Sequence, residues 1–250
     1  IEQFLNPFFA GVFLDKEQTS SSRLFNYYLK NFIFGKTAIP EKGIQDIPNQ
    51  MARQCKQTNI LLNHDIQSVK NNVIETDQGI IKAEFVISAL NGSSSAKLFN
   101  FPSPSYHKTQ NLYFYSDTPI SADKVINLNS NSKQYINNFY CVSNINPNAS
   151  PNNKHLYSLS IINEAEDIDE NIIKKEAESI LGKAVSEWTF LKSYSINQAV
   201  LRQRTSRNKL NYRYNKKRLL FCGDWTLQGS IQGALKSGKE IINELLKIVR

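Results

Sequence analysis

The chain has 250 residues, of which 40% are hydrophobic, so it is long enough to bury the core of one or two domains. Its three cysteines, Cys55, Cys141 and Cys222, form no CxxC or metal-ligand spacing, which argues against a disulfide framework and favours a reducing compartment. No apolar run approaches 18 residues, which excludes a membrane-spanning helix within this sequence. The three histidines are scattered, and we expect no metal site. The net charge of +8 leaves open an anionic partner.

Residues 1–34 begin with an aromatic-rich run over residues 4–14 and continue into a helix. Ser20 to Ser22 are suited to cap that helix, because a serine hydroxyl accepts hydrogen bonds from free N–H groups of the first turn. Its apolar positions recur at helical spacing: Leu24, Phe25, Tyr28, Leu29 and Phe32. The phenylalanines of residues 4–14 are typical of ordinary core. The alternative is that some of them wall an apolar substrate cavity or a membrane-facing entrance.

A second helix and a group of strands follow. Pro40 and Gly43 lead into a helical pattern that includes Ile47 and Met51. Three strand-like runs then cover residues 59–63, 66–74 and 80–89, and Gly79 marks a hairpin before the last run. The end of that run, 86–89, is a short buried strand.

Residues 91–197 have a different pattern. Alternating segments at 111–115, 125–128, 138–143 and 155–162 are separated by turns rich in Ser, Asn and Pro, which predicts an antiparallel sheet. A helix should follow, with Asp169 as its N-cap and Gly182 as its C-cap. Trp188 to Ser195 reads as one more strand.

A basic stretch at residues 202–218 holds eight basic residues, two tyrosines and no acidic residue. Three interpretations are open. It is a solvated loop whose charges flank a hydrophobic strand, it attracts an anionic membrane surface or substrate, or it tracks nucleic acid. Because the stretch runs directly into a buried strand, the loop interpretation is favoured, and we expect no nucleic-acid partner.

The most informative segment is 219–246. Leu219 to Cys222 is a short apolar strand, Gly223-Asp224 forms a turn, and a glycine-containing loop precedes an amphipathic helix. The helix has its apolar positions at helical spacing: Ile231, Ala234, Leu235, Ile241, Ile242, Leu245, Leu246 and Val249. A carboxylate beside a helix N-terminus is suited to hold a ligand that is both polar and partly anionic, because free N–H groups and the positive end of the dipole face it.

This segment resembles the C-terminal FAD motif of the superfamily of flavin amine oxidases, protoporphyrinogen oxidases and phytoene (carotenoid) desaturases. The resemblance extends in outline over nearly the whole chain, but only residues 35–47 and 219–246 are specific. It implies that the strand and the Gly-Asp-Trp turn meet the ribityl-phosphate arm of FAD, and that the following helix points at the N1/C2=O edge of the flavin. The residues implied in cofactor binding are Gly223, Asp224, Trp225, Gly229, Ser230, Ile231 and Ala234, with Ile66 against the adenine.

The resemblance also implies a fold and a division of the chain. We expect a mixed α/β protein with a discontinuous, Rossmann-like FAD-binding domain over 35–90 and 196–250, in which strands 86–89 and 219–222 share a sheet. An α+β substrate domain with an antiparallel sheet would take 1–34 and 91–195. The ten glycines contain no GxGxxG, the other half of such a site. With Ile1 opening in mid-domain, this leads us to expect a C-terminal portion of a longer protein that lacks the N-terminal βαβ unit.

The expected function is that of an FAD-dependent oxidoreductase that removes hydride from a small apolar molecule, with FAD held non-covalently because no cysteine lies between Gly223 and Gly233. The catalytic residue is unknown from the sequence. The alternative is a non-catalytic module that keeps the flavin fold for binding or scaffolding. We expect a cytoplasmic protein or one peripheral to a membrane, with a lipophilic small molecule as its partner and an oligomeric state that the sequence leaves undetermined.

Overall fold

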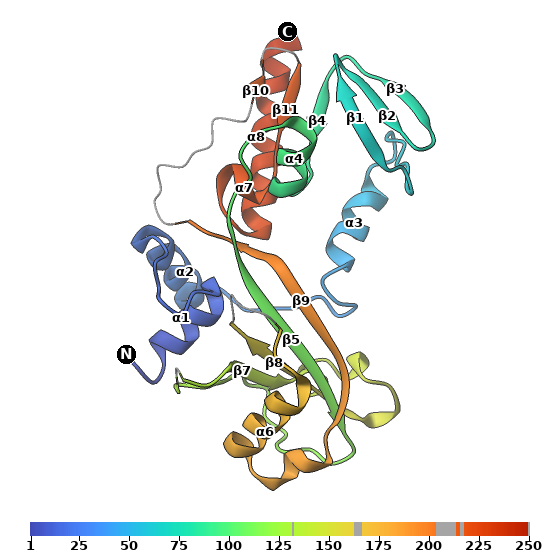
Figure 1. Cartoon of the computed structure of the whole chain (residues 1–250). Helices are drawn as coiled ribbons and strands as arrows, with labels where there is room; N and C mark the ends of the chain where they lie inside the picture. Colours follow the sequence, from blue (N-terminus) through green and yellow to red (C-terminus); the bar gives the residue numbers. More distant parts are fainter. Residues whose placement is uncertain (132, 163–166, 204–213, 216–217, 250) are drawn as a thin grey trace. The chain divides into compact units, whose positions relative to one another are not determined.

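The computed structural model describes residues 1–131, 133–162, 167–203, 214–215 and 218–249 (Figure 1). Its contacts divide the chain into two units, one formed by residues 1–49 and 106–200 and the other by 50–105 and 201–250. Both units are discontinuous and alternate along the chain. The boundaries differ from the expected ones. Residues 35–49 and 196–200, expected in the FAD-binding domain, belong to the first unit, and residues 91–105, expected in the substrate domain, belong to the second. The roles assigned to the two units stay a prediction.

A five-stranded sheet forms the centre of the first unit, in the order β6-β7-β8-β5-β9. The strands are β5 (Tyr106–Ser116), β6 (Asn127–Leu128), β7 (Ile136–Cys141), β8 (His155–Ile161) and β9 (Thr189–Leu201). The pairs β6–β7, β7–β8 and β5–β8 are antiparallel, as the alternating pattern predicted. Short helices connect them: α5 (Val142–Ile145) and the 3-10 turns η1 (Pro147–Ala149), η2 (Pro151–Asn153) and η3 (Lys183–Glu187).

Helix α6 (Glu170–Leu181) buries its apolar side in the core of this unit. Ile173 and Ala177 pack with Leu159 and other fully buried strand residues, and the rings of Tyr157 and Trp188 stack with their centroids 4.2 Å apart. The predicted caps are confirmed. The Asp169 carboxylate accepts a hydrogen bond from Asn171 N at 2.9 Å, and Gly182 adopts a φ of 86°.

Two N-terminal helices, α1 (Leu5–Phe13) and α2 (Ser22–Phe34), belong to the same unit. The cap expected at residues 20–22 is confirmed, because Ser21 Oγ accepts from Arg23 N at 3.3 Å. Aromatic rings join the two helices at three points: Phe8–Phe32, Phe9–Phe25 and Phe13–Tyr28, with centroids 5.0, 4.5 and 5.5 Å apart. Phe9 and Phe13 are therefore core residues, as the simpler interpretation held, whereas Phe8 is half-buried and Phe4 is exposed. Helix α3 (Asp46–Gln54) follows where the second pattern predicted a helix.

The second unit contains two three-stranded sheets. The first is an antiparallel meander of β1 (Ile66–Lys70), β2 (Val73–Thr76) and β3 (Gly79–Lys82). The hairpin before Gly79 is confirmed, but three strand predictions were wrong. The run 80–89 is divided between β3, which ends at Lys82, and a separate strand over Val86–Ser88 in the other sheet. Residues 59–63 form no strand, and the run 66–74 is two strands separated by Asn71 and Asn72. Both asparagines have positive φ values, 49° and 64°, a conformation that asparagine tolerates and that a reading of hydropathy alone misses.

The second sheet of this unit has the order β10-β11-β4, with β10 (Tyr214–Asn215), β11 (Leu219–Phe221) and β4 (Val86–Ser88). Strands β4 and β11 are parallel, with Val86 opposite Leu219 and Ser88 opposite Phe221. Each is followed by a helix: α4 (Gly92–Phe99) after β4, and α7 (Asp224–Leu227) and then α8 (Ile231–Val249) after β11. The basic stretch at 202–218 lies mostly outside the described residues, so its three interpretations stay predictions.

Helix α8 differs from expectation in the side that it buries. The buried positions are Gly233, Ser237 and Ile241, where small residues let the backbone approach closely. Five residues predicted on its apolar face are exposed: Ile231, Leu235, Ile242, Leu246 and Val249. Apolar spacing correctly predicted the helix, but it could not show which side packs within the described chain. None of the helices in the described ranges is both long and apolar enough to cross a bilayer.

Candidate cofactor site

The site lies where the parallel strands β4 and β11 end side by side. Cys222 N donates to Ser88 O at 3.0 Å, which extends the pairing beyond the last strand residues. Each strand is then followed by a helix. Asn91 Oδ1 caps α4 by accepting a hydrogen bond from Ser94 N at 2.8 Å. The expectation that residues 86–89 and 219–222 share a sheet is confirmed. In open α/β sheets, ligands bind outside the carboxyl ends of parallel strands.

Gly223 makes the turn from β11 into α7. Its φ of 145° lies in a region that only glycine adopts readily, and an added Cβ would lie 2.7 Å from Nε1 of Trp225. The backbone is held on both sides of the residue. Gly223 N donates to Ser237 Oγ at 2.8 Å, and Gly223 O accepts from Thr226 Oγ1 at 2.8 Å. A glycine is therefore required here by the backbone and by the neighbouring indole.

Asp224 is a half-buried carboxylate at the first position of α7. Its Oδ1 accepts a hydrogen bond from Trp225 N at 2.8 Å. Burial raises the pKa of Asp224, an effect that the backbone hydrogen bond from Trp225 only partly offsets. Among the residues that the structure describes, no other residue donates a hydrogen bond to Oδ2.

Trp225 occupies the core of the second unit. The indole is 2% exposed, its Nε1 donates to Leu90 O at 3.1 Å, and it stacks on Phe101 with the centroids 5.6 Å apart. The indole thereby ties the β11 turn to the chain that follows β4. The cofactor contact expected from Trp225 stays a prediction, and the structure gives its side chain a packing role.

The start of α8 is built from residues 228–234. Ser230 Oγ accepts from Gly233 N at 2.9 Å and so caps the helix, and Gly229 N donates to Gln203 Oε1 at 2.9 Å. The N–H groups of Ile231 and Gln232 have no intrahelical acceptor, because they belong to the first turn. Gln228 Nε2 is buried, and no described atom accepts its hydrogen bond. Within the described part of the chain, this helix start therefore has N–H donors that no intrahelical acceptor satisfies.

Two of the expected residues are placed differently. Ala234 is half-buried inside α8, with its N–H already bonded to Ser230 O at 2.9 Å. Ile66 begins β1, which belongs to the separate meander, and its side chain is 40% exposed. No hydrogen bond of the described residues joins Ile66 to segment 223–234. The roles of both residues stay predictions.

The sequence predicted the strand at 86–89 beside the site but not helix α4, which follows it. The Asn91-Gly-Ser-Ser run before Ala96 is a helix-start signal that went unread. Ser95, on the first turn of α4, is fully buried and lies 3.2 Å from Ser88 across their hydroxyl oxygens. Gln203, which receives the Gly229 N–H, carried no local signal, because it is 26 residues away along the chain.

The thiol and metal chemistry of the described residues is limited. Cys55, Cys141 and Cys222 are free, and burial raises the pKa of the Cys222 thiol, which keeps it protonated near neutral pH. Within the ranges that the structure describes, no three His, Cys, Asp or Glu side chains are grouped to hold a metal ion.

The parallel strand pair, the turn at Gly223 and the capped helix together form a mixed α/β arrangement. The sequence matches the model of the flavin containing amine oxidoreductase family over residues 1–241. The chain belongs to this family, which confirms the resemblance drawn from segments 35–47 and 219–246. No curated protein matched the sequence.

Several solved structures share the fold. An oxidoreductase from Methanosarcina mazei is 17% identical with a TM-score of 0.70, over 96% of this chain and 64% of that one. Putrescine oxidase bound to putrescine is 14% identical with a TM-score of 0.61, over 82% and 53%. Reduced UDP-galactopyranose mutase is 11% identical with a TM-score of 0.65, over 98% and 64%. The chain therefore spans about half to two thirds of these structures.

Proposed function

We propose that the protein acts as an FAD-dependent oxidoreductase and holds FAD non-covalently at the carboxyl edge of β4 and β11. The observation that carries this proposal is the turn at the end of β11, where Asp224 Oδ2 receives no hydrogen bond from another described residue, followed by an α8 start whose first N–H groups have no intrahelical acceptor. A carboxylate suits the hydroxyls of a ribityl chain, and helix N–H groups suit an electron-rich carbonyl or phosphate oxygen. Family membership supports the flavin as the group concerned.

The chain's own residues would bind and orient the cofactor. Gly223 lets the backbone turn without a side chain, Asp224 would accept hydrogen bonds from the sugar alcohol arm, and Ile231 and Gln232 would donate through their backbone N–H groups. A bound flavin would supply the acceptor for a hydride taken from the substrate. The positive end of the α8 dipole would stabilise negative charge on the ligand atoms next to it. We assign substrate binding to the first unit.

The substrate that we propose is a small, mainly apolar molecule. This preference rests on the aromatic-rich residues 4–14, of which Phe4 remains 59% exposed while Phe9 and Phe13 are buried. The alternative is a non-catalytic module that keeps the flavin fold, which would bind flavin without reducing it.

The proposal is tested by flavin binding and then by flavin reduction. FAD is titrated into the purified chain and into Asp224→Ala, with Glu244→Ala on the exposed side of α8 as the matched control. Weaker binding in Asp224→Ala alone supports the site, and equal binding in all three proteins contradicts it. Anaerobic bleaching of the bound flavin by an apolar amine such as benzylamine would support an enzyme. Flavin that binds but is not reduced by any small-molecule donor would favour the module.

A further inference from the structure

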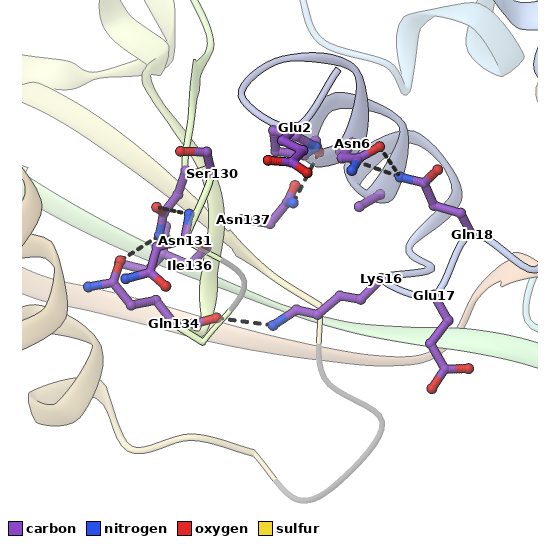
Figure 2. Close-up of a pocket in the computed structure, with 13 residues that line it drawn as sticks. Glu2, Asn6, Lys16, Glu17, Gln18, Ser130, Asn131, Gln134, Ile136 and Asn137 are labelled. Carbon is purple, nitrogen blue, oxygen red and sulfur yellow. Dashed lines mark hydrogen bonds between the residues drawn. The ribbon is translucent and has the colours of Figure 1, made fainter.

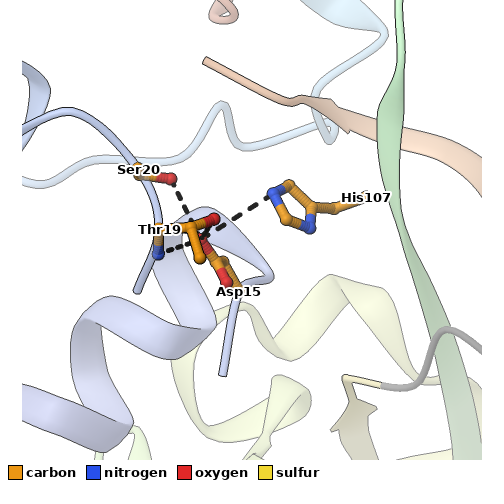
Figure 3. A network of polar contacts seen from close by, with 4 residues as sticks. All are labelled: Asp15, Thr19, Ser20 and His107. Atoms are coloured by element: carbon orange, nitrogen blue, oxygen red, sulfur yellow. Dashed lines mark hydrogen bonds and ion pairs between the residues drawn. The ribbon is translucent and has the colours of Figure 1, made fainter. Parts of the chain in front are cut away.

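Nearly all buried polar side chains in the described part of the chain have hydrogen-bond partners. Asn137 on β7 is 6% exposed, and its Nδ2 donates to Pro7 O of α1 at 3.1 Å (Figure 2). The carboxylate of Asp15, 5% exposed, accepts from Thr19 N at 2.7 Å and from Ser20 Oγ at 3.3 Å (Figure 3). Such pairing is general in folded proteins, because a buried polar group has lost its hydrogen bonds to water. A buried donor without a partner therefore requires an explanation.

Two buried side-chain atoms of the described residues lack a partner, Trp188 Nε1 and Gln228 Nε2. Trp188 is 2% exposed and stacks on Tyr157 within the apolar core of the first unit, which encloses its indole N–H. Gln228 is half-buried and lies between α7 and α8, next to the proposed flavin site. Among the described residues, its amide nitrogen is thus the one buried, unpaired side-chain donor beside that site.

The backbone holds Gln228 against the first turn of α8. The residue is extended, with φ −157° and ψ 131°, and its carbonyl accepts from Ser230 N at 2.7 Å. Gly233 is so close that an added Cβ would lie 1.9 Å from Gln228 O and 3.1 Å from Gln228 Cβ. A side chain at position 233 would displace Gln228, so this glycine keeps the residue at the helix start. The position of Gln228 is fixed before a ligand binds, which lowers the ordering cost of binding.

The groups around Gln228 are suited to an electron-rich oxygen. The N–H groups of Ile231 and Gln232 belong to the first turn and have no intrahelical acceptor. The positive end of the α8 dipole lies at the same turn. Gly229 N already donates to Gln203 Oε1 at 2.9 Å, which fixes the loop between Gln228 and the helix. A ligand oxygen at this helix start would meet backbone donors and the side-chain amide of Gln228 together.

We propose that Gln228 is a further flavin-binding residue, whose side-chain amide donates a hydrogen bond to a carbonyl oxygen of the bound flavin. The inference rests on the proposed function, because it requires flavin at the start of α8. Negative charge on the flavin ring increases when the ring is reduced, and a donor that is already in place stabilises that charge. Gln228 should therefore contribute more to the binding of reduced flavin than to the binding of oxidised flavin.

The test compares the 250-residue chain with Gln228→Met, which keeps the length of the side chain and removes the donor. Gln67→Met, at an exposed position of β1 in the same unit, is the matched control. FAD is titrated by calorimetry up to millimolar concentration, in its oxidised form and, without oxygen, in its reduced form. Gln228→Met should weaken the binding of oxidised FAD about two- to tenfold, because a neutral hydrogen bond is lost. The factor should be larger for reduced FAD, because that hydrogen bond is charge-assisted. Gln67→Met should bind both forms as the parent does.

Urea unfolding without flavin provides a second measurement. The donor is unpaired in the ligand-free chain, so Gln228→Met should be at least as stable as the parent. Gln228→Glu keeps one side-chain oxygen and replaces the donor by an acceptor. It should bind reduced FAD more weakly still, and it decides the matter if Gln228→Met does not fold.

The possible failures are distinguishable. Equal affinities in the parent and the folded Gln228 variants would overturn the inference and leave the proposed function intact. A parent chain that binds neither form of FAD would refute the proposed function and the inference with it. A folded Gln228→Met protein that is less stable than the parent would show that the chain itself satisfies the amide, which would also overturn the inference.

Discussion

Asp224→Asn should separate the stability of the second unit from its ability to bind flavin. The amide keeps an oxygen for the hydrogen bond from Trp225 N, which Asp224 Oδ1 now accepts at 2.8 Å, so the start of α7 should persist. Burial raises the pKa of Asp224, which means that the folded state disfavours the ionised form relative to the unfolded chain. For a carboxyl group with a raised pKa, this destabilisation is absent at low pH and fully present above the folded pKa. At pH 7 the neutral amide removes it, and Asp224→Asn should be at least as stable as the parent.

Flavin binding should change in the opposite direction. The variant loses a charge-assisted hydrogen bond to the cofactor arm, worth about 1.5–3 kcal/mol, which corresponds to a dissociation constant about ten- to 150-fold higher. Stability is measured by urea unfolding at pH 7 and affinity by quenching of flavin fluorescence. Glu244→Gln serves as the control, since this exposed residue of α8 should alter neither. An Asp224→Asn protein that is less stable and binds FAD normally would refute both parts of the reasoning.

Three further outcomes are expected. Gly223→Ala should destabilise the second unit by about 2–4 kcal/mol in urea unfolding, because its φ of 145° and the indole 2.7 Å from the new Cβ both oppose a side chain; a change below 0.5 kcal/mol would show that the turn is relaxed. Burial alone would raise the pKa of Asp15, but its hydrogen bonds from Thr19 and Ser20 and the facing His107 outweigh burial and lower that pKa. The stability that Asp15 contributes is therefore present above its unfolded pKa near 3.9 and is lost as the pH falls through the folded pKa. The urea midpoint of Asp15→Asn should depend less on pH below 5 than the midpoint of the parent does. Parallel curves for the two proteins would contradict this. Finally, the 250-residue chain should bind FAD only weakly, because it contains no GxGxxG; stoichiometric binding at nanomolar concentration would show that the site is complete without that motif.

The parts of the fold that the sequence predicted correctly depend on short-range signals. Asp169 and Gly182 mark the ends of α6, because a cap acts within one helical turn. The strands of the large sheet were predicted correctly from alternating runs, because each strand has one buried face. The turn at Asn71 and Asn72 was missed because its apolar neighbours on both sides read as one continuous strand. The turn forms because asparagine tolerates a positive φ, and a hydropathy pattern does not register that preference.

The candidate site was predictable where the signal is local and not where it depends on packing. Gly223 makes the turn that the strand-turn-helix pattern predicted, whereas Asp224 begins the short helix α7, which the pattern did not predict. The sequence could not show that Trp225 faces the core, because its indole N–H donates to the carbonyl of Leu90, which is 135 residues away along the chain.

The central claim is that flavin binds at the carboxyl edge of β4 and β11. Hydrogen–deuterium exchange of the 250-residue chain, with and without millimolar FAD, tests this claim most directly and does not require tight binding. We predict slower exchange in peptides that cover residues 86–92 and 222–235, and none of this protection in Asp224→Ala. Exchange that is unchanged in both segments, or protection confined to peptides outside the second unit, would contradict the account.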